Sequence, residues 1–118
     1  MIETVGEVAR TVWKELGYGY REDVYEKAMA HEMRTTHPNL EFAVEAYVEI
    51  LYKGVAVGLQ RLDFVIDGEL AVELKTGAKI SPAHRAQTEA YLRTTRFEKG
   101  LLVCFTPTGV MCELMPSS

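Results

Sequence analysis

One stretch of the sequence, residues 61–75 (RLDFVIDGELAVELK), restricts the fold more than any other. Apolar and polar residues alternate on both sides of a DGE segment at residues 67–69, a pattern typical of a β-hairpin. The length of the hairpin loop decides where two carboxylates lie. With a two-residue loop, Asp63 and Glu73 would point to opposite faces of the sheet, because residues that lie directly opposite each other share a face.

A three-residue loop at 67–69 places Asp63 directly opposite Glu73. In this register one face of the hairpin is wholly apolar, and a slip by one residue would bury charges. Three-residue loops with glycine in the left-handed conformation are common in hairpins, so we predict this register. The predicted apolar face holds Leu62, Phe64, Ile66, Leu70, Val72 and Leu74, and the other face holds Arg61, Asp63, Val65, Ala71, Glu73 and Lys75.

Hydrophobic spacing predicts the remaining elements. Apolar residues recur at helical intervals in two early segments, and from Phe42 the period changes to two. Ser81 and Pro82 are typical of the cap and first position of a later helix. The order indicates an α+β domain with one mixed central sheet flanked by helices. The predicted helices cover residues 2–16, about 21–36 and 82–95, and the predicted strands cover 42–50, 55–66, 70–76, 100–105 and 109–115.

Composition sets the broad class. The 118 residues are 47% hydrophobic, which predicts a single domain over residues 1–118 with its own core. No apolar run reaches the ~18 residues of a membrane span. Cys104 and Cys112 are too few for a disulfide framework, so we expect reduced thiols in a cytoplasmic protein. The net charge of -4 argues against nucleic-acid binding by a basic surface alone, but it leaves room for an enzyme whose bound cations offset carboxylates.

The chemistry of the 61–75 segment lies in Asp63, Glu73 and Lys75. Two opposed carboxylates repel each other unless a cation or a proton lies between them. Carboxylate oxygens suit Mg²⁺ or Mn²⁺, and a lysine on the same face can orient water or stabilise charge on a phosphate. The ordinary alternative is a solvated sheet face on which Lys75 neutralises Glu73.

Two other stretches add polar residues at helical spacing. In GYREDVY, residues 19–25, Glu22 lies in a first helical turn and Tyr25 one turn later; the alternative is a glutamate favoured by the helix dipole and a core tyrosine. In HRAQTEAYL, residues 84–92, Gln87 and Tyr91 share a helical face one turn after His84. The alternative is an amphipathic helix that packs on the sheet through its alanines at 83, 86 and 90.

Together these motifs resemble the PD-(D/E)XK nuclease superfamily, and within it the small GxxExxY proteins. Their order along residues 19–105 is also that of the superfamily's restriction-endonuclease-like core, α-β-β-β-α-β. The residues that carry the resemblance are Gly19, Glu22 and Tyr25 of G-x-x-E-x-x-Y, Asp63, Glu73 and Lys75 of D…ExK, and Gln87 and Tyr91 of QxxxY.

The resemblance implies a set of roles. Asp63 and Glu73 would bind Mg²⁺ or Mn²⁺, with the backbone carbonyl of Leu74 as a third ligand. Glu22 would help to hold the metal, directly or through water. Lys75 would be the catalytic lysine.

The later helix would complete the site. Gln87 and Tyr91 would position the DNA backbone or the lysine, and His84 is grouped with them as a substrate-positioning residue without a fixed family role. The implied activity is metal-dependent hydrolysis of phosphodiester bonds in DNA, with RNA left open. The alternative is a catalytically silent module that binds nucleic acid or protein. A homodimer or a separate targeting subunit would supply the surface that a small acidic domain lacks.

Overall fold

A computed structural model of the chain describes residues 1–116. The described residues form three helices and five strands in the predicted order, and the predicted α+β class with a mixed sheet is confirmed. The elements are α1 (Ile2–Leu16), α2 (Glu22–Thr36), β1 (Phe42–Tyr52), β2 (Val55–Ile66), β3 (Leu70–Thr76), α3 (Pro82–Thr94), β4 (Lys99–Thr106) and β5 (Gly109–Met115).

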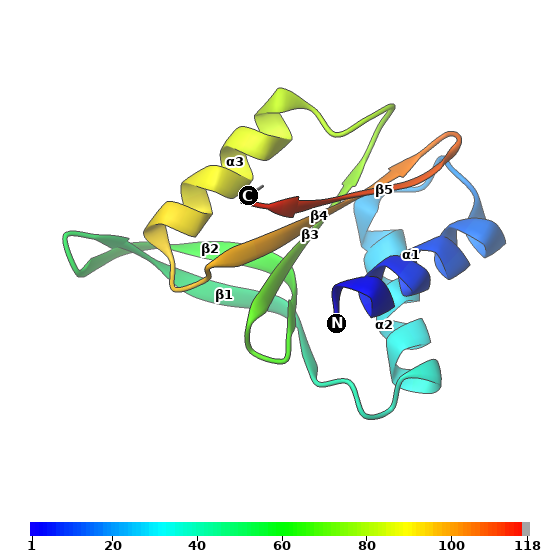
Figure 1. The fold of residues 1–118 in the computed structure, drawn as a ribbon, viewed down its shortest axis with the longest axis horizontal. Coiled ribbons are helices and arrows are strands. Elements are labelled where there is room, and N and C mark those ends of the chain that lie inside the picture. Colours follow the sequence, from blue (N-terminus) through cyan, green and yellow to red (C-terminus); the bar gives the residue numbers. More distant parts are fainter. Residues whose placement is uncertain (117–118) are drawn as a thin grey trace.

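The sheet has the strand order β1-β2-β3-β4-β5. Only β3 and β4 run parallel, because α3 connects them as a crossover helix, and the other neighbours are antiparallel. Figure 1 shows α1 and α2 together on one side of the sheet and α3 on the other. The main core lies between the sheet and the α1–α2 pair, and two smaller clusters lie on the α3 side.

The predicted hairpin register is confirmed. Ile66 pairs with Leu70 and Phe64 with Val72, so the loop contains the three residues 67–69. Asp67 and Gly68 both adopt left-handed backbone conformations, with φ of 51° and 70°. Glycine and aspartate tolerate this region, which explains why the chain reverses here without moving the apolar residues off the core face.

The predicted division of faces fails at the start of the hairpin. Leu62 packs with Val65 and Tyr91 on the α3 side, whereas the prediction placed it on the same face as Phe64, which packs in the main core. Arg61 reaches Glu26 of α2, so its side chain also lies on the face opposite to the predicted one. The pairing of β1 with β2 is interrupted at Asp63, and the facing β1 residue has an unusual φ of 53°, so the alternation of side chains reverses at this point.

Helix α3 begins as predicted. The Ser81 hydroxyl accepts a hydrogen bond from the backbone N–H of His84, and the His84 ring accepts one from the Ser81 N–H. The helix buries Thr88 and Tyr91, while its alanines at 83, 86 and 90 are exposed. The alternative in which those alanines face the sheet is therefore wrong, and Gln87 lies beside the buried face.

The distal part of the β1–β2 ribbon extends beyond the rest of the sheet (Figure 1). Its two-residue turn at 53–54 has both residues at positive φ, as hairpin geometry favours. Large apolar side chains on the ribbon are exposed: Tyr47, Leu51, Tyr52, Val55, Val57 and Leu59.

The two cysteines are free thiols, buried at Cys104 on β4 and exposed at Cys112 on the edge strand β5. Among residues 1–116, none of the helices combines the length and apolar character needed to cross a membrane.

Candidate metal and catalytic site

The site forms where strands β2 and β3 separate. Their backbone pairing ends at Phe64 and Val72, and two side-chain carboxylates take over from there. The Asp63 backbone N–H donates to Oε1 of Glu73 at 2.9 Å, and the Leu74 N–H donates to Oδ2 of Asp63 at 2.7 Å. Each carboxylate thus bridges to the other strand, and the predicted proximity of Asp63 and Glu73 is confirmed.

Both carboxylates are buried, with exposed fractions of 6% for Asp63 and 8% for Glu73. Burial and the neighbouring charge of Asp63 raise the pKa of Glu73 to about 7. The N–H of Asp63 and the charges of Lys75 and Arg61 act in the opposite direction. Negative charge on this buried pair is therefore destabilising, and a proton or a cation beside Glu73 would reduce the repulsion between the two carboxylates.

Sequence reasoning missed Glu26, a second buried acid of helix α2. The side chain is 5% exposed and accepts a hydrogen bond from Arg61 Nη2 at 3.2 Å. Burial and the nearby Asp63 together raise the pKa of Glu26 to about 7, although Arg61 acts in the opposite direction. A helical signal existed, because Glu26 directly follows the core residue Tyr25 and lies one turn after Glu22 on the same face.

Arg61 connects this acid to the site. Its Nη1 lies 2.7 Å from Oδ1 of Asp63, and its Nη2 lies 3.2 Å from Glu26 and 3.2 Å from Glu45. The guanidinium therefore contacts carboxylates from β2, α2 and β1. The hydrogen bond to Asp63 is the main cause of a raised pKa for Arg61.

Lys75 and Gln87 meet at the edge of the site. Lys75 Nζ donates to Oε1 of Gln87 at 3.2 Å, which links the end of β3 to α3. Gln87 is exposed but does not face away, so its predicted position beside Lys75 is confirmed. A lysine held by an amide at the surface can still reach an incoming anion.

Tyr91 lies deeper than Gln87. It is 2% exposed, and its hydroxyl has no hydrogen-bond partner among the described residues. Burial and the charge of Glu73 raise its pKa, so the phenol stays protonated beneath the carboxylates. Only glycine fits opposite it: a Cβ built on Gly100 would lie 2.7 Å from the Tyr91 hydroxyl oxygen.

Glu22 and His84 lie at the margin. Glu22 is exposed. Burial and the charge of Lys75 lower the pKa of His84, and the charge of Glu22 acts in the opposite direction. The N-terminal ends of α2 and α3 therefore approach the end of β3. Within residues 1–116 no three His, Cys, Asp or Glu side chains are arranged to hold a metal together, so this structure does not bring Glu22 to the Asp63–Glu73 pair.

The donors present fit a hard divalent cation. Asp63 and Glu73 offer carboxylate oxygens. A residue in a β-strand directs its N–H and its C=O toward the same neighbouring strand. Because the Leu74 N–H donates to Asp63, the Leu74 carbonyl also points toward β2. Oxygen-only sets of this kind suit Mg²⁺ or Mn²⁺ better than zinc. The rest of the coordination would come from water and substrate, as is usual for Mg²⁺.

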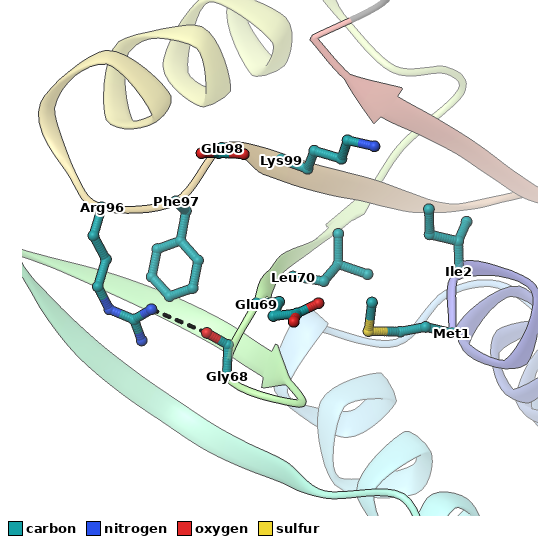
Figure 2. A pocket seen from close by; sticks show the side chains of 9 residues that line it. All are labelled: Met1, Ile2, Gly68, Glu69, Leu70, Arg96, Phe97, Glu98 and Lys99. Carbon is teal, nitrogen blue, oxygen red and sulfur yellow. Dashed lines mark hydrogen bonds between the residues drawn. The ribbon is translucent and has the colours of Figure 1, made fainter.

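A separate pocket lies at the opposite end of the β2–β3 hairpin (Figure 2). Exposed charged residues of both signs line it, and Arg96 donates to the backbone carbonyl of Gly68 at 3.0 Å across it. None of the residues of the carboxylate site contributes to this pocket, and it contains no buried charge pair. The buried carboxylates of Asp63 and Glu73 therefore lie at the diverging end of the hairpin and not in this pocket.

The sequence model of the PD-(D/E)XK nuclease superfamily matches residues 1–113. The chain belongs to this superfamily, and its mixed sheet with three helices in the described part agrees with the restriction-endonuclease-like fold. Proteins of this superfamily are typically nucleases, and they generally use divalent metal ions.

Among solved structures, the chain is similar to the crystal structure of SSO0001, with 25% identity and a TM-score of 0.55. The match covers 79% of this chain and 49% of that one, so the similar region spans about half of SSO0001. A search of the curated proteins found no match.

Proposed function

We propose that this protein hydrolyses phosphodiester bonds of DNA with Mg²⁺ or Mn²⁺ held by Asp63 and Glu73 and by the Leu74 carbonyl. One observation carries the proposal: two carboxylates more than nine-tenths buried lie side by side where the strands separate, and burial raises the pKa of Glu73 to about 7. Such an arrangement costs stability unless a cation completes it.

The chain's own residues would divide the work. A bound divalent cation would neutralise charge on the phosphate and lower the pKa of a bound water. Lys75, held by Gln87, would stabilise the negative charge that develops on the phosphate or orient the attacking water. Tyr91 is too buried to touch the substrate, so it would act as a positioning residue that supports Glu73 from below.

The marginal residues would act through water and substrate. Glu22 would hold a water of the metal's hydration shell, and His84 would lie beside the incoming strand. We further propose that the chain is one of the GxxExxY proteins, on the basis of Gly19, Glu22 and Tyr25. Tyr25 itself has a core role, since it is fully buried, stacks on Phe105 and donates to the Gly17 carbonyl at 2.6 Å.

A catalytically silent binding module is the second candidate, and one observation favours it. The Arg61 guanidinium lies 2.7 Å from Asp63, so a protein cation already balances part of the charge that a metal would balance. In such a module the same fold would bind nucleic acid or protein without cleaving.

For partners, we propose a second copy of the chain or a targeting subunit that covers the exposed apolar side chains of the β1–β2 ribbon. Light scattering on the purified protein would test self-association, which a monomer at all concentrations would contradict.

The test of the function is a cleavage panel. The purified protein is incubated with linear duplex DNA, circular duplex DNA, single-stranded DNA and RNA, each with Mg²⁺, Mn²⁺ or EDTA. We expect metal-dependent cleavage of at least one DNA substrate and none with EDTA. Retention of DNA in a gel-shift assay without cleavage under either metal would instead support the silent module.

A further inference from the structure

Arg61 has more carboxylate partners than any other cation described in the site. It joins Asp63, Glu26 and Glu45, which come from three different elements. Asp63 and Glu26 are buried, and a buried carboxylate without a counter-charge is strongly destabilising. Arg61 supplies that counter-charge, and its planar guanidinium suits two carboxylates at once.

The two oxygens of Asp63 have different partners. Oδ2 accepts the Leu74 N–H, a fixed backbone donor at 2.7 Å. Oδ1 accepts Arg61 Nη1, also at 2.7 Å, from a side chain that is 41% exposed. A cation that binds Asp63 therefore meets a backbone donor on Oδ2 and a partly exposed, positively charged side chain on Oδ1.

We propose that Arg61 is an internal counter-cation that competes with the divalent metal for Asp63 and releases Oδ1 when the metal binds. The inference rests on the proposed metal site. Arg61 has room to move because its side chain is partly exposed, and Glu26 and Glu45 remain as partners for Nη2 after it leaves Asp63. Arg61 is thus a positioning residue: its positive charge offsets the repulsion between the carboxylates until the metal binds.

The competition predicts an unusual result: removal of the arginine strengthens metal binding. Two like charges a few Å apart at a protein surface repel strongly enough to change affinity by an order of magnitude. We expect Arg61→Gln to bind Mn²⁺ about tenfold more tightly than the wild type in isothermal titration calorimetry. The metal-free variant should also unfold at a lower temperature, since three carboxylates lose their partner.

Two control variants separate charge from structure. Arg85→Gln removes a matched ion pair: Arg85 is also 41% exposed and lies 2.7 Å from Glu113, on another part of the sheet. Its Mn²⁺ affinity should equal that of the wild type. Arg61→Lys keeps the positive charge, so its affinity should stay within about threefold of the wild type.

The outcomes distinguish this inference from the proposed function. If the wild type binds Mn²⁺ and cleaves DNA but Arg61→Gln binds no more tightly, the inference is overturned and the function stands. If neither the wild type nor any variant binds Mn²⁺, both the inference and the proposed function are overturned. Equal tightening in Arg61→Lys would show that charge is not the cause and would also overturn the inference.

A measurement on the wild type covers the case in which Arg61→Gln does not fold. The Nε–H resonance of Arg61, assigned with Arg61→Lys, is followed by NMR during titration with diamagnetic Mg²⁺. We expect this resonance to shift as Arg61 leaves Asp63, while the Arg85 resonance stays in place. An unmoved Arg61 resonance at saturating Mg²⁺ would overturn the proposal.

Discussion

The two ends of the β2–β3 hairpin have the same sequence pattern but different chemistry. At the turn end, Ile66 and Leu70 form a regular backbone pair and are buried in the main core. At the other end, hydrogen bonds to the carboxylates of Asp63 and Glu73 replace the backbone pairing. These carboxylates are buried, and burial and mutual repulsion raise the pKa of Glu73. The turn end therefore belongs to the core of the fold, whereas the other end places buried charge where we propose the active site.

The largest expected effect tests the stabilising end. Phe64 is fully buried in the core, so Phe64→Ala should lower the free energy of unfolding by about 3–5 kcal/mol. Leu59→Ala on the same strand is the matched control: Leu59 is 64% exposed, and the change should stay within about 0.5 kcal/mol. Urea unfolding followed by circular dichroism measures both. Equal losses in the two variants would contradict the assignment of the core.

The next effect separates catalysis from metal binding at the functional end. Lys75 is not a proposed ligand, so Lys75→Ala should slow cleavage by on the order of 10²-fold while its Mn²⁺ affinity stays near that of the wild type. Single-turnover kinetics and calorimetry provide the two readouts. Loss of Mn²⁺ binding in this variant would show that the lysine organises the metal site itself.

Sequence alone predicted most of the fold and the proximity of Asp63 and Glu73. Alternation and turn chemistry are local, so they gave the register that places Asp63 opposite Glu73. The link between Arg61 and Glu26 could not be predicted, because it joins residues 35 positions apart and depends on how α2 packs on the sheet. The reversal of side chains at Leu62 could not be predicted either. Strict alternation assumes an uninterrupted strand, and the pairing with β1 is interrupted next to Leu62.

The third effect concerns pH and the cost of the buried charge. The pKa of Glu73 is raised from 4.5 to about 7, so the folded state binds its proton more tightly than the unfolded state does. This contribution to stability is present below pH 4.5 and is lost as pH rises through 7. Glutamine mimics the protonated acid, so metal-free Glu73→Gln should melt about 5 °C above the wild type at pH 8 and close to it at pH 4.5. A difference that does not change with pH would contradict the raised pKa.

The smallest effect concerns the residue that holds the lysine. Gln87→Ala removes one hydrogen bond to Lys75, worth about 1 kcal/mol, and should slow cleavage roughly fivefold. Glu89→Ala, another exposed change on α3, should have no effect. Equal rates for Gln87→Ala and the wild type in a cleavage time course would remove Gln87 from the site.

The most direct test of the account is the rate of Mn²⁺-dependent DNA cleavage by Glu73→Gln. The variant keeps the oxygen that accepts the Asp63 N–H and, from the pH argument, is at least as stable as the wild type at pH 8, so misfolding would not explain a loss. We predict a fall of about 10²-fold or more, while Asp67→Asn, which removes a carboxylate from the exposed turn of the same hairpin, cleaves at the wild-type rate. Wild-type cleavage by Glu73→Gln would contradict the assignment of the diverging end of the hairpin as the active site.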